Sequence, residues 1–275
     1  MRQPFNDARY SSIADFVSAV RLPVLNAKNQ DEYSHFMRDQ YGDWYGAGCN
    51  TGEDVAKTMM AGWQEGRDRM NELRDQIGDV DLVPVSRKRR LVRAASGDTL
   101  DIHKVWSGNL DTAWRTPRRL TRVSPNRIDL CANMICAGYE HSDVLFYRGA
   151  AAAVLSDLLE QAGFMVRLVV NFGGTTGDNA EINKYTSCRI VVKDHGIPFD
   201  VTSTSAVILP GFFRALGHAW ISNHAPAKRS MGGIHVGQGV IDDGEILLSH
   251  NVRDHGTALA FIRDTIADLN KQSAA

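Results

Sequence analysis

Residues 128–172, IDLCANMICAGYEHSDVLFYRGAAAAVLSDLLEQAGFMVRLVVNF, decide the fold of this chain. Ile128–Ile135 and Met165–Phe172 are short apolar runs, which are typical of buried strands. Between them, Val144–Ala162 has the length and the alanine-rich face of a helix, and Gly163 ends it. Strand–helix alternation of this kind predicts an α/β sheet with helices packed on its faces.

The alternation continues to the carboxyl end. We expect strands at Cys188–Lys193 and Glu245–Leu248, and helices at about Thr204–Ile221 and Gly256–Asn270. Residues 128–275 therefore predict an α/β body, a mixed sheet flanked by helices. An α+β arrangement is the alternative, and no OB-fold is expected.

Residues 1–80 predict a helical region. Ser11–Val20 opens with a serine cap and has apolar residues at helical spacing. Thr51 and Asp54 have the spacing of a capping box, and we expect one helix from there through Ile77. Two glycines inside it, Gly62 and Gly66, each weaken that helix by about 1 kcal/mol relative to alanine.

Residues 81–127 predict a basic connecting arm, irregular and rich in turns. Its 41-residue core, Arg87–Arg127, has eleven Lys and Arg against three Asp, a net charge of +8. The whole chain has a net charge of -1, so the remainder sums to -9. A patch of this sign indicates either a polyanion ligand or a solvated basic face that balances acidic neighbours.

Two tryptophans in the segment indicate that the polyanion it binds is a single-stranded nucleic acid. Trp106 and Trp114 could stack on bases, at roughly 1–3 kcal/mol per base, or could anchor the arm to the core. Arginine outnumbers lysine in the segment, which favours bidentate phosphate contacts. No motif for reading a duplex groove is present. The predicted DNA-binding residues are Arg87, Lys88, Arg89, Arg90, Arg93, Lys104, Trp106, Trp114, Arg115, Arg118, Arg119 and Arg122.

Other chemistry finds little support in the sequence. The histidine pairs His218/His224 and His250/His255 lack the i, i+4 spacing of a helical zinc site, so we interpret them as structural. Residues 171–178, NFGGTTGD, lack the ending of a phosphate loop and favour a strand-to-strand connection. No nucleophile motif is present. We predict no catalytic residue, no metal and no cofactor.

The four cysteines, Cys49, Cys131, Cys136 and Cys188, form no CxxC pair, and we expect buried, reduced thiols. No window approaches eighteen apolar residues, so no transmembrane helix is expected. The amino terminus lacks the pattern of a secretory signal. Together these features predict a protein that works inside a cell.

Residues 148–170, RGAAAAVLSDLLEQAGFMVRLVV, resemble a von Willebrand A-like α/β domain. The metal site of that family needs a DxSxS motif after the first strand. Leu130–Ile135 stands in that place and has no such ligands, so the resemblance predicts no bound Mg²⁺.

The chain also resembles a bacteriophage family of single-stranded-DNA-binding RNA polymerase cofactors, from phages that package a giant RNA polymerase in the virion. The matching motifs are AGWQEG at 61–66, the RKRR…GDTLDI…AWR run at 87–115 and the helix at 148–164. The resemblance implies a non-OB single-strand binder that recruits a second, heterodimeric phage RNA polymerase to melted promoters. It also implies the cytoplasm of the infected bacterial host, and a homo-oligomer is expected.

Two other functions stay open. The first is a protein-interaction module with a degenerate von Willebrand A-like domain, whose basic face meets an acidic partner. The second is a phage nucleotide- or DNA-modifying enzyme with an unrecognised site. Unlike the acidic tails of ordinary single-strand-binding proteins, the end of this sequence, Lys271–Ala275, carries no acid. Partner recruitment through an acidic tail is therefore not expected.

Overall fold

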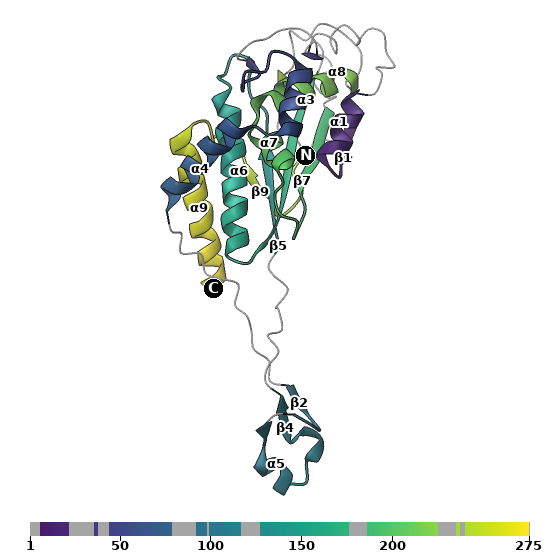
Figure 1. The fold of residues 1–275 in the computed structure, drawn as a ribbon, viewed down its shortest axis with the longest axis vertical. Coiled ribbons are helices and arrows are strands. Elements are labelled where there is room, and N and C mark those ends of the chain that lie inside the picture. Colours follow the sequence, from purple (N-terminus) through teal and green to yellow (C-terminus); the bar gives the residue numbers. More distant parts are fainter. Residues whose placement is uncertain are drawn as a thin grey trace.

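The structure is a computed structural model that describes residues 6–21, 36–37, 44–78, 92–97, 99–116, 127–175, 186–224, 235–236 and 240–274. Its centre is a mixed sheet (Figure 1). In sheet order the strands are β1 (Asn6–Tyr10), β7 (Thr186–Lys193), β6 (Met165–Thr175), β5 (Arg127–Asn133) and β9 (Ile246–Leu248), and β8 (His235–Val236) pairs with β6. β5, β6 and β9 run parallel, whereas β7 is antiparallel to β6 and parallel to β1.

The predicted strand–helix–strand unit is confirmed. β5 is followed by α6 (Asp143–Gln161), and the chain returns as β6, which pairs in parallel with the whole of β5. Gly163 has a φ of 93°, a left-handed conformation that glycine adopts without the steric penalty of a Cβ. The α/β fold class is therefore correct, and a mixed sheet with flanking helices is not the closed barrel of an OB-fold.

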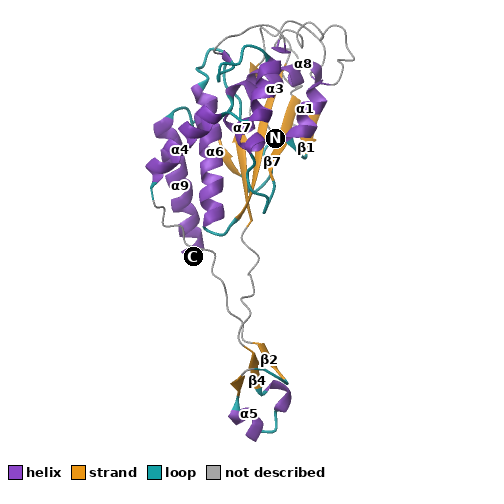
Figure 2. Ribbon diagram, in the orientation of Figure 1, coloured by secondary structure: helices purple, strands orange, loops and turns teal. Residues whose placement is uncertain are grey.

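The helices pack along this sheet, as the colouring by secondary structure shows (Figure 2). The amino-terminal helices share one hydrophobic core with the carboxyl-terminal ones. The helices are α1 (Ile13–Arg21), α3 (Gly52–Ala61), α4 (Gln64–Ile77), α7 (Val201–Ile208), the π-helix η3 (Phe212–Gly217), α8 (His218–His224) and α9 (His255–Ala274).

The two faces of the sheet differ in chemistry because successive side chains of a strand point to opposite sides. On the face toward the helices, Leu130, Leu168 and Ile190 are fully buried in the main core. The side chains at alternate positions of these strands point to the opposite face, and they include Asn171 of β6 and Arg189 of β7. Both of these polar side chains donate to the carbonyl oxygen of Val240, so residues 240–245 are held against this second face.

The prediction of one helix through Ile77 is wrong, because the chain breaks after α3. Gly62 adopts a φ of 92°, and Trp63 turns inward to pack its ring against Phe146 at a centroid distance of 5.8 Å. A Cβ on Gly66 would lie 2.3 Å from the Trp63 ring, so glycine is required there. The AGWQEG motif is thus a helix junction, whereas the predicted capping box at Thr51 and Asp54 is confirmed.

The predicted helical segment Thr204–Ile221 is interrupted, and the strands β1 and β8 of the main sheet were not predicted. α7 ends at Ile208, and Leu209 is extended, as expected for a residue that precedes a proline. β1, with the sequence NDARY, lacks an apolar run because it is an edge strand that pairs only with β7 among the described residues.

All four cysteines are buried free thiols, as predicted. Burial raises the pKa of each thiol, and that of Cys131 rises to about 12. Because the thiolate is the reactive form, we expect the native protein to react slowly with Ellman's reagent at pH 8. The denatured protein should titrate all four thiols. Rapid reaction of a thiol in the native protein would contradict this burial.

No helix within the described ranges is long and apolar enough to cross a membrane.

Candidate nucleic-acid interface

Part of the basic segment folds into a small unit of its own (Figure 1). β4 (Trp114–Thr116) lies between β2 (Val92–Ala94) and β3 (Thr99–Leu100) in an antiparallel sheet. A short helix, α5 (Ile102–Trp106), and a 3-10 turn, η2 (Leu110–Thr112), connect β3 to β4. The expectation of an irregular arm is therefore wrong for residues 92–97 and 99–116.

The unit is closed around a small centre. Ala113 is fully buried, and its carbonyl oxygen accepts a hydrogen bond from the Asp101 amide at 2.7 Å. Lys104 Nζ donates to Thr112 Oγ1 at 2.9 Å, which joins α5 to η2. This fold was not predictable from the sequence because its strands have two or three residues each, which is too few for a periodic pattern.

The apolar side chains of this unit face solvent to an unusual degree. Trp106 is 85% exposed, and Ile102 is 59% exposed. These two residues are four apart on α5, so they share one face of the helix. Leu110 and Leu100 are also exposed. Four exposed apolar side chains on one small unit favour a role in binding.

The predicted DNA-binding residues divide between this unit and its flanks. Arg93, Lys104, Trp106, Trp114 and Arg115 lie on the unit, where Trp106 is exposed and Trp114 is half-buried. Arg93 and Arg115 are register partners on β2 and β4. The predictions that lie outside the described residues are Arg87, Lys88, Arg89, Arg90, Arg118, Arg119 and Arg122.

The net positive charge of the basic segment lies in a different part of it from the two tryptophans. Residues 92–116 contain three Lys or Arg and three Asp, so their net charge is zero. Residues 87–91 contribute four cations and residues 117–127 another four, which together give the whole +8. The segment therefore combines a neutral unit that presents apolar side chains with two strongly basic flanks.

The histidine pairs of the sequence lie in different surroundings. His218 is buried beside the Phe213 ring, at a centroid distance of 4.8 Å. Burial, reinforced by the Arg214 cation, lowers the pKa of His218 to about 4, so this side chain is neutral at pH 7. His224 stacks on Trp220 at 4.3 Å. No group of three or more His, Cys, Asp or Glu within the described ranges could hold a metal ion.

Two buried arginines fix the loop after β5. Arg148 Nη1 donates to the carbonyl oxygens of Asn133 and Ile135, and burial lowers the pKa of Arg148 to about 10. Arg214 Nη2 donates to the carbonyl oxygen of Glu140 in the same loop, at 2.5 Å. These hydrogen bonds tie the loop between β5 and α6 to α6 and to η3.

An ion network on the second sheet face was not predicted. Both terminal nitrogens of Arg9 donate to Asp242 at 3.0 Å, and Arg189 pairs with Glu245 and, at 3.2 Å, with Asp242. Hydrogen bonding from Arg9 keeps the pKa of Asp242 below its usual range. Since Arg9 and Asp242 lie 233 residues apart in the sequence, no local pattern could have found this contact.

The glycine-rich stretch after Asn171 belongs to the sheet. Residues 171–175 continue β6, and Gly173 and Gly174 pair with Ser187 and Thr186 of β7. The interpretation as a strand-to-strand connection is therefore wrong for residues 171–175, which are strand, and residues 176–178 lie outside the described residues. A Cβ on Gly173 would lie 2.8 Å from the Thr186 carbonyl oxygen, so this glycine allows close pairing of the two strands.

Fold and site together define a mixed α/β protein with a basic segment before strand β5. The chain belongs to the family described as domain of unknown function DUF7192, which it matches over residues 4–268. No curated protein and no solved structure matches the chain.

Proposed function

We propose that this protein binds single-stranded DNA through residues 87–127 and acts as a transcription cofactor that recruits a phage RNA polymerase to melted promoter DNA. The observation that carries the proposal is Trp106, which is 85% exposed on a unit flanked by eight cations. Exposed aromatic rings next to basic chain are what sequence-tolerant binding of single strands requires.

The basic flanks supply the electrostatic part of this binding. Each phosphate that a Lys or Arg neutralises releases a counterion, so affinity falls as salt rises. Residues 87–91 and 117–127 supply eight such cations, so a polyanion suits these flanks.

The exposed face of α5 supplies the stacking part. Single-stranded DNA leaves its bases free to stack, whereas in a duplex they are paired and covered. Trp106 offers a ring to such a base, and Ile102 on the same helix face adds apolar contact. A preference for single strands over duplex follows from this arrangement.

Replacing Trp106 with alanine tests the stacking role. We expect single-strand affinity to fall roughly 5- to 150-fold, which corresponds to one lost base contact of 1–3 kcal/mol. Thermal stability should stay unchanged because the side chain is largely in solvent. Fluorescence anisotropy with a labelled oligonucleotide measures the affinity.

Tyr139→Ala is the matched control, because Tyr139 is 93% exposed but lies in the loop after β5, outside the basic segment. It should leave the affinity unchanged. Equal affinity of the wild type and the Trp106 variant would contradict the stacking role.

Polymerase recruitment and the host-cell cytoplasm rest on the resemblance to the phage cofactor family. A co-sedimentation assay with the phage polymerase, single-stranded promoter DNA and this protein tests recruitment. We expect a ternary complex that requires all three components, and self-association in sedimentation velocity if the homo-oligomer forms.

A protein-interaction module is the second candidate, favoured by the same exposed apolar residues of α5. It predicts that Trp106→Ala reduces partner binding while single-strand affinity is absent in the wild type as well. The oligonucleotide titration therefore separates the two candidates.

A further inference from the structure

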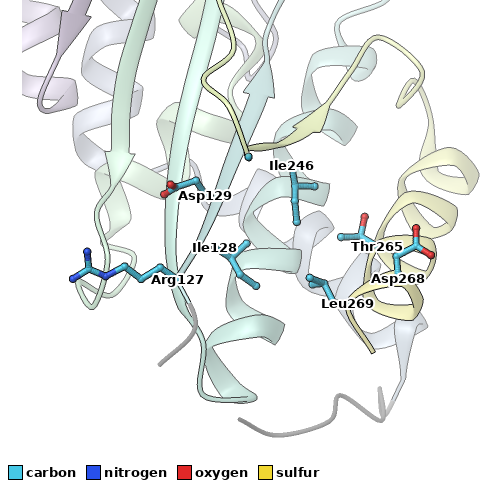
Figure 3. A pocket seen from close by; sticks show the side chains of 8 residues that line it. Arg127, Ile128, Asp129, Ile246, Thr265, Asp268 and Leu269 are labelled. Carbon is cyan, nitrogen blue, oxygen red and sulfur yellow. The ribbon is translucent and has the colours of Figure 1, made fainter. Parts of the chain in front are cut away.

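A cavity of about 420 Å³ opens between the start of β5 and α9 (Figure 3). This volume lies within the range of small-ligand sites in proteins, which begins at about 300 Å³. The residues that line it come from β5, from β9 and the turn before it, and from α9. They are Arg127, Ile128, Asp129, Gly244, Ile246, Thr265, Asp268 and Leu269.

The cavity lies where the sheet leaves a strand edge open. β9 pairs with β5 only at Leu130–Ala132, whereas β6 pairs with β5 along its whole length. Within the described ranges, Arg127–Asp129 therefore have a strand on one side only. Backbone groups along such an edge can form hydrogen bonds with a ligand.

The walls of the cavity are apolar and face one another. Figure 3 shows Ile128 on the same side of β5 as Ile246 and Leu269, whereas Arg127 and Asp129 point to the other side. Branched aliphatic side chains on two walls suit a flat, apolar ring between them. A nucleobase has such faces.

The polar groups of the rim come from α9. Asp268 is 67% exposed and pairs with Lys271 at 3.0 Å, so its carboxylate has lone pairs available to a ligand. A carboxylate accepts hydrogen bonds from the exocyclic amino groups of cytosine, adenine and guanine, whereas thymine presents a carbonyl oxygen in that position. The Thr265 hydroxyl lies beside it on the same helix.

The turn that forms the third wall is held in place by the ion network of the second sheet face. Gly244 in this turn has a φ of 85°. Arg9 binds Asp242 before it, and Arg189 binds Glu245 after it. The Asp242 amide also donates to Glu245 at 3.0 Å, which closes the turn. This wall is therefore pre-organised, which lowers the cost of binding.

We propose that this cavity binds one base of the single strand and prefers a base with an exocyclic amino group over thymine. Arg127, exposed on the other side of β5, contacts a phosphate outside the cavity. The inference rests on the single-strand binding proposed above. Arg127 is the last cation of the basic segment, five residues after Arg122, so a strand bound to the segment arrives at this end of β5.

The test compares 12-nucleotide oligo-dC and oligo-dT by fluorescence anisotropy at one salt concentration. The wild type should bind oligo-dC about fivefold more tightly, the low end for one base contact. Asp268→Asn should bring the two affinities close together. Asp264→Asn is the matched control because Asp264 is exposed on α9, one turn earlier, and does not line the cavity. It removes the same charge and should leave the ratio unchanged.

Thr265→Val, which keeps the shape and removes the hydroxyl, should also reduce the ratio. Equal binding of the two oligonucleotides by the wild type would overturn the base preference while leaving single-strand binding intact. A preference that survives Asp268→Asn would overturn the assignment to this cavity. If the wild type binds neither oligonucleotide, the proposed function itself fails, and this inference fails with it.

Discussion

Replacing Arg87, Arg89 and Arg90 together with alanine is expected to lower single-strand affinity roughly a hundredfold at about 0.1 M salt. Three lost phosphate contacts reduce the slope of log affinity against log salt by about 2, at about 0.7 for each contact. The difference in log affinity between the wild type and the variant grows as salt falls. Between 1 M and 0.1 M salt it grows by about 2 log units. Anisotropy titrations at several salt concentrations measure both quantities.

A control for this prediction removes three cations elsewhere. Lys57, Arg253 and Arg263 are exposed and lie on or beside α3 and α9, outside the basic segment. Their triple alanine variant has the same net charge as the first, so a general charge effect would weaken binding equally. Equal losses in the two variants would contradict a role for residues 87–90.

Among substitutions that add one methyl group to the described core, Gly149→Ala is expected to lower the free energy of unfolding the most. A Cβ at this position of α6 would lie 1.9 Å from the Val207 carbonyl oxygen, so α6 and α7 would have to separate. Overpacking against backbone that cannot rotate away costs about 3 kcal/mol or more. Differential scanning calorimetry should show a melting temperature roughly 6–12 °C lower.

Gly138→Ala is its control. Nothing lies within 4 Å of a Cβ at Gly138, which sits in the loop after β5 and is absent from the positive-φ glycines. The substitution should change stability by no more than about 0.5 kcal/mol. Normal stability of the Gly149 variant would contradict the close packing of α6 on α7.

Long periodic elements could be predicted from the sequence, and their interruptions could not. The runs around Ile128 and Met165 and the alanine-rich α6 carried enough local pattern. The break after α3 required knowledge that Trp63 packs on Phe146, a contact between distant parts of the chain. β1 was missed because a polar edge strand takes its conformation from its partner β7.

The kind of site, a basic segment with two tryptophans, could be predicted from the sequence, but the arrangement of its residues could not. Its charge and tryptophans are visible in the sequence, yet the exposure of Trp106 depends on how α5 folds against η2. The open edge of β5 depends on where β9 stops pairing, and the turn at Gly244 depends on Arg9 from the other edge of the sheet. Such long-range contacts decide which of the candidate residues are available to a ligand.

The most direct test of single-strand binding is an anisotropy titration of the wild type with labelled single-stranded and duplex oligonucleotides of equal length, repeated across salt. We predict tighter binding of the single strand and an affinity that falls as salt rises, by about 0.7 log units per phosphate contact for each log unit of salt. Equal affinity for the two forms, or an affinity independent of salt, would contradict the proposal.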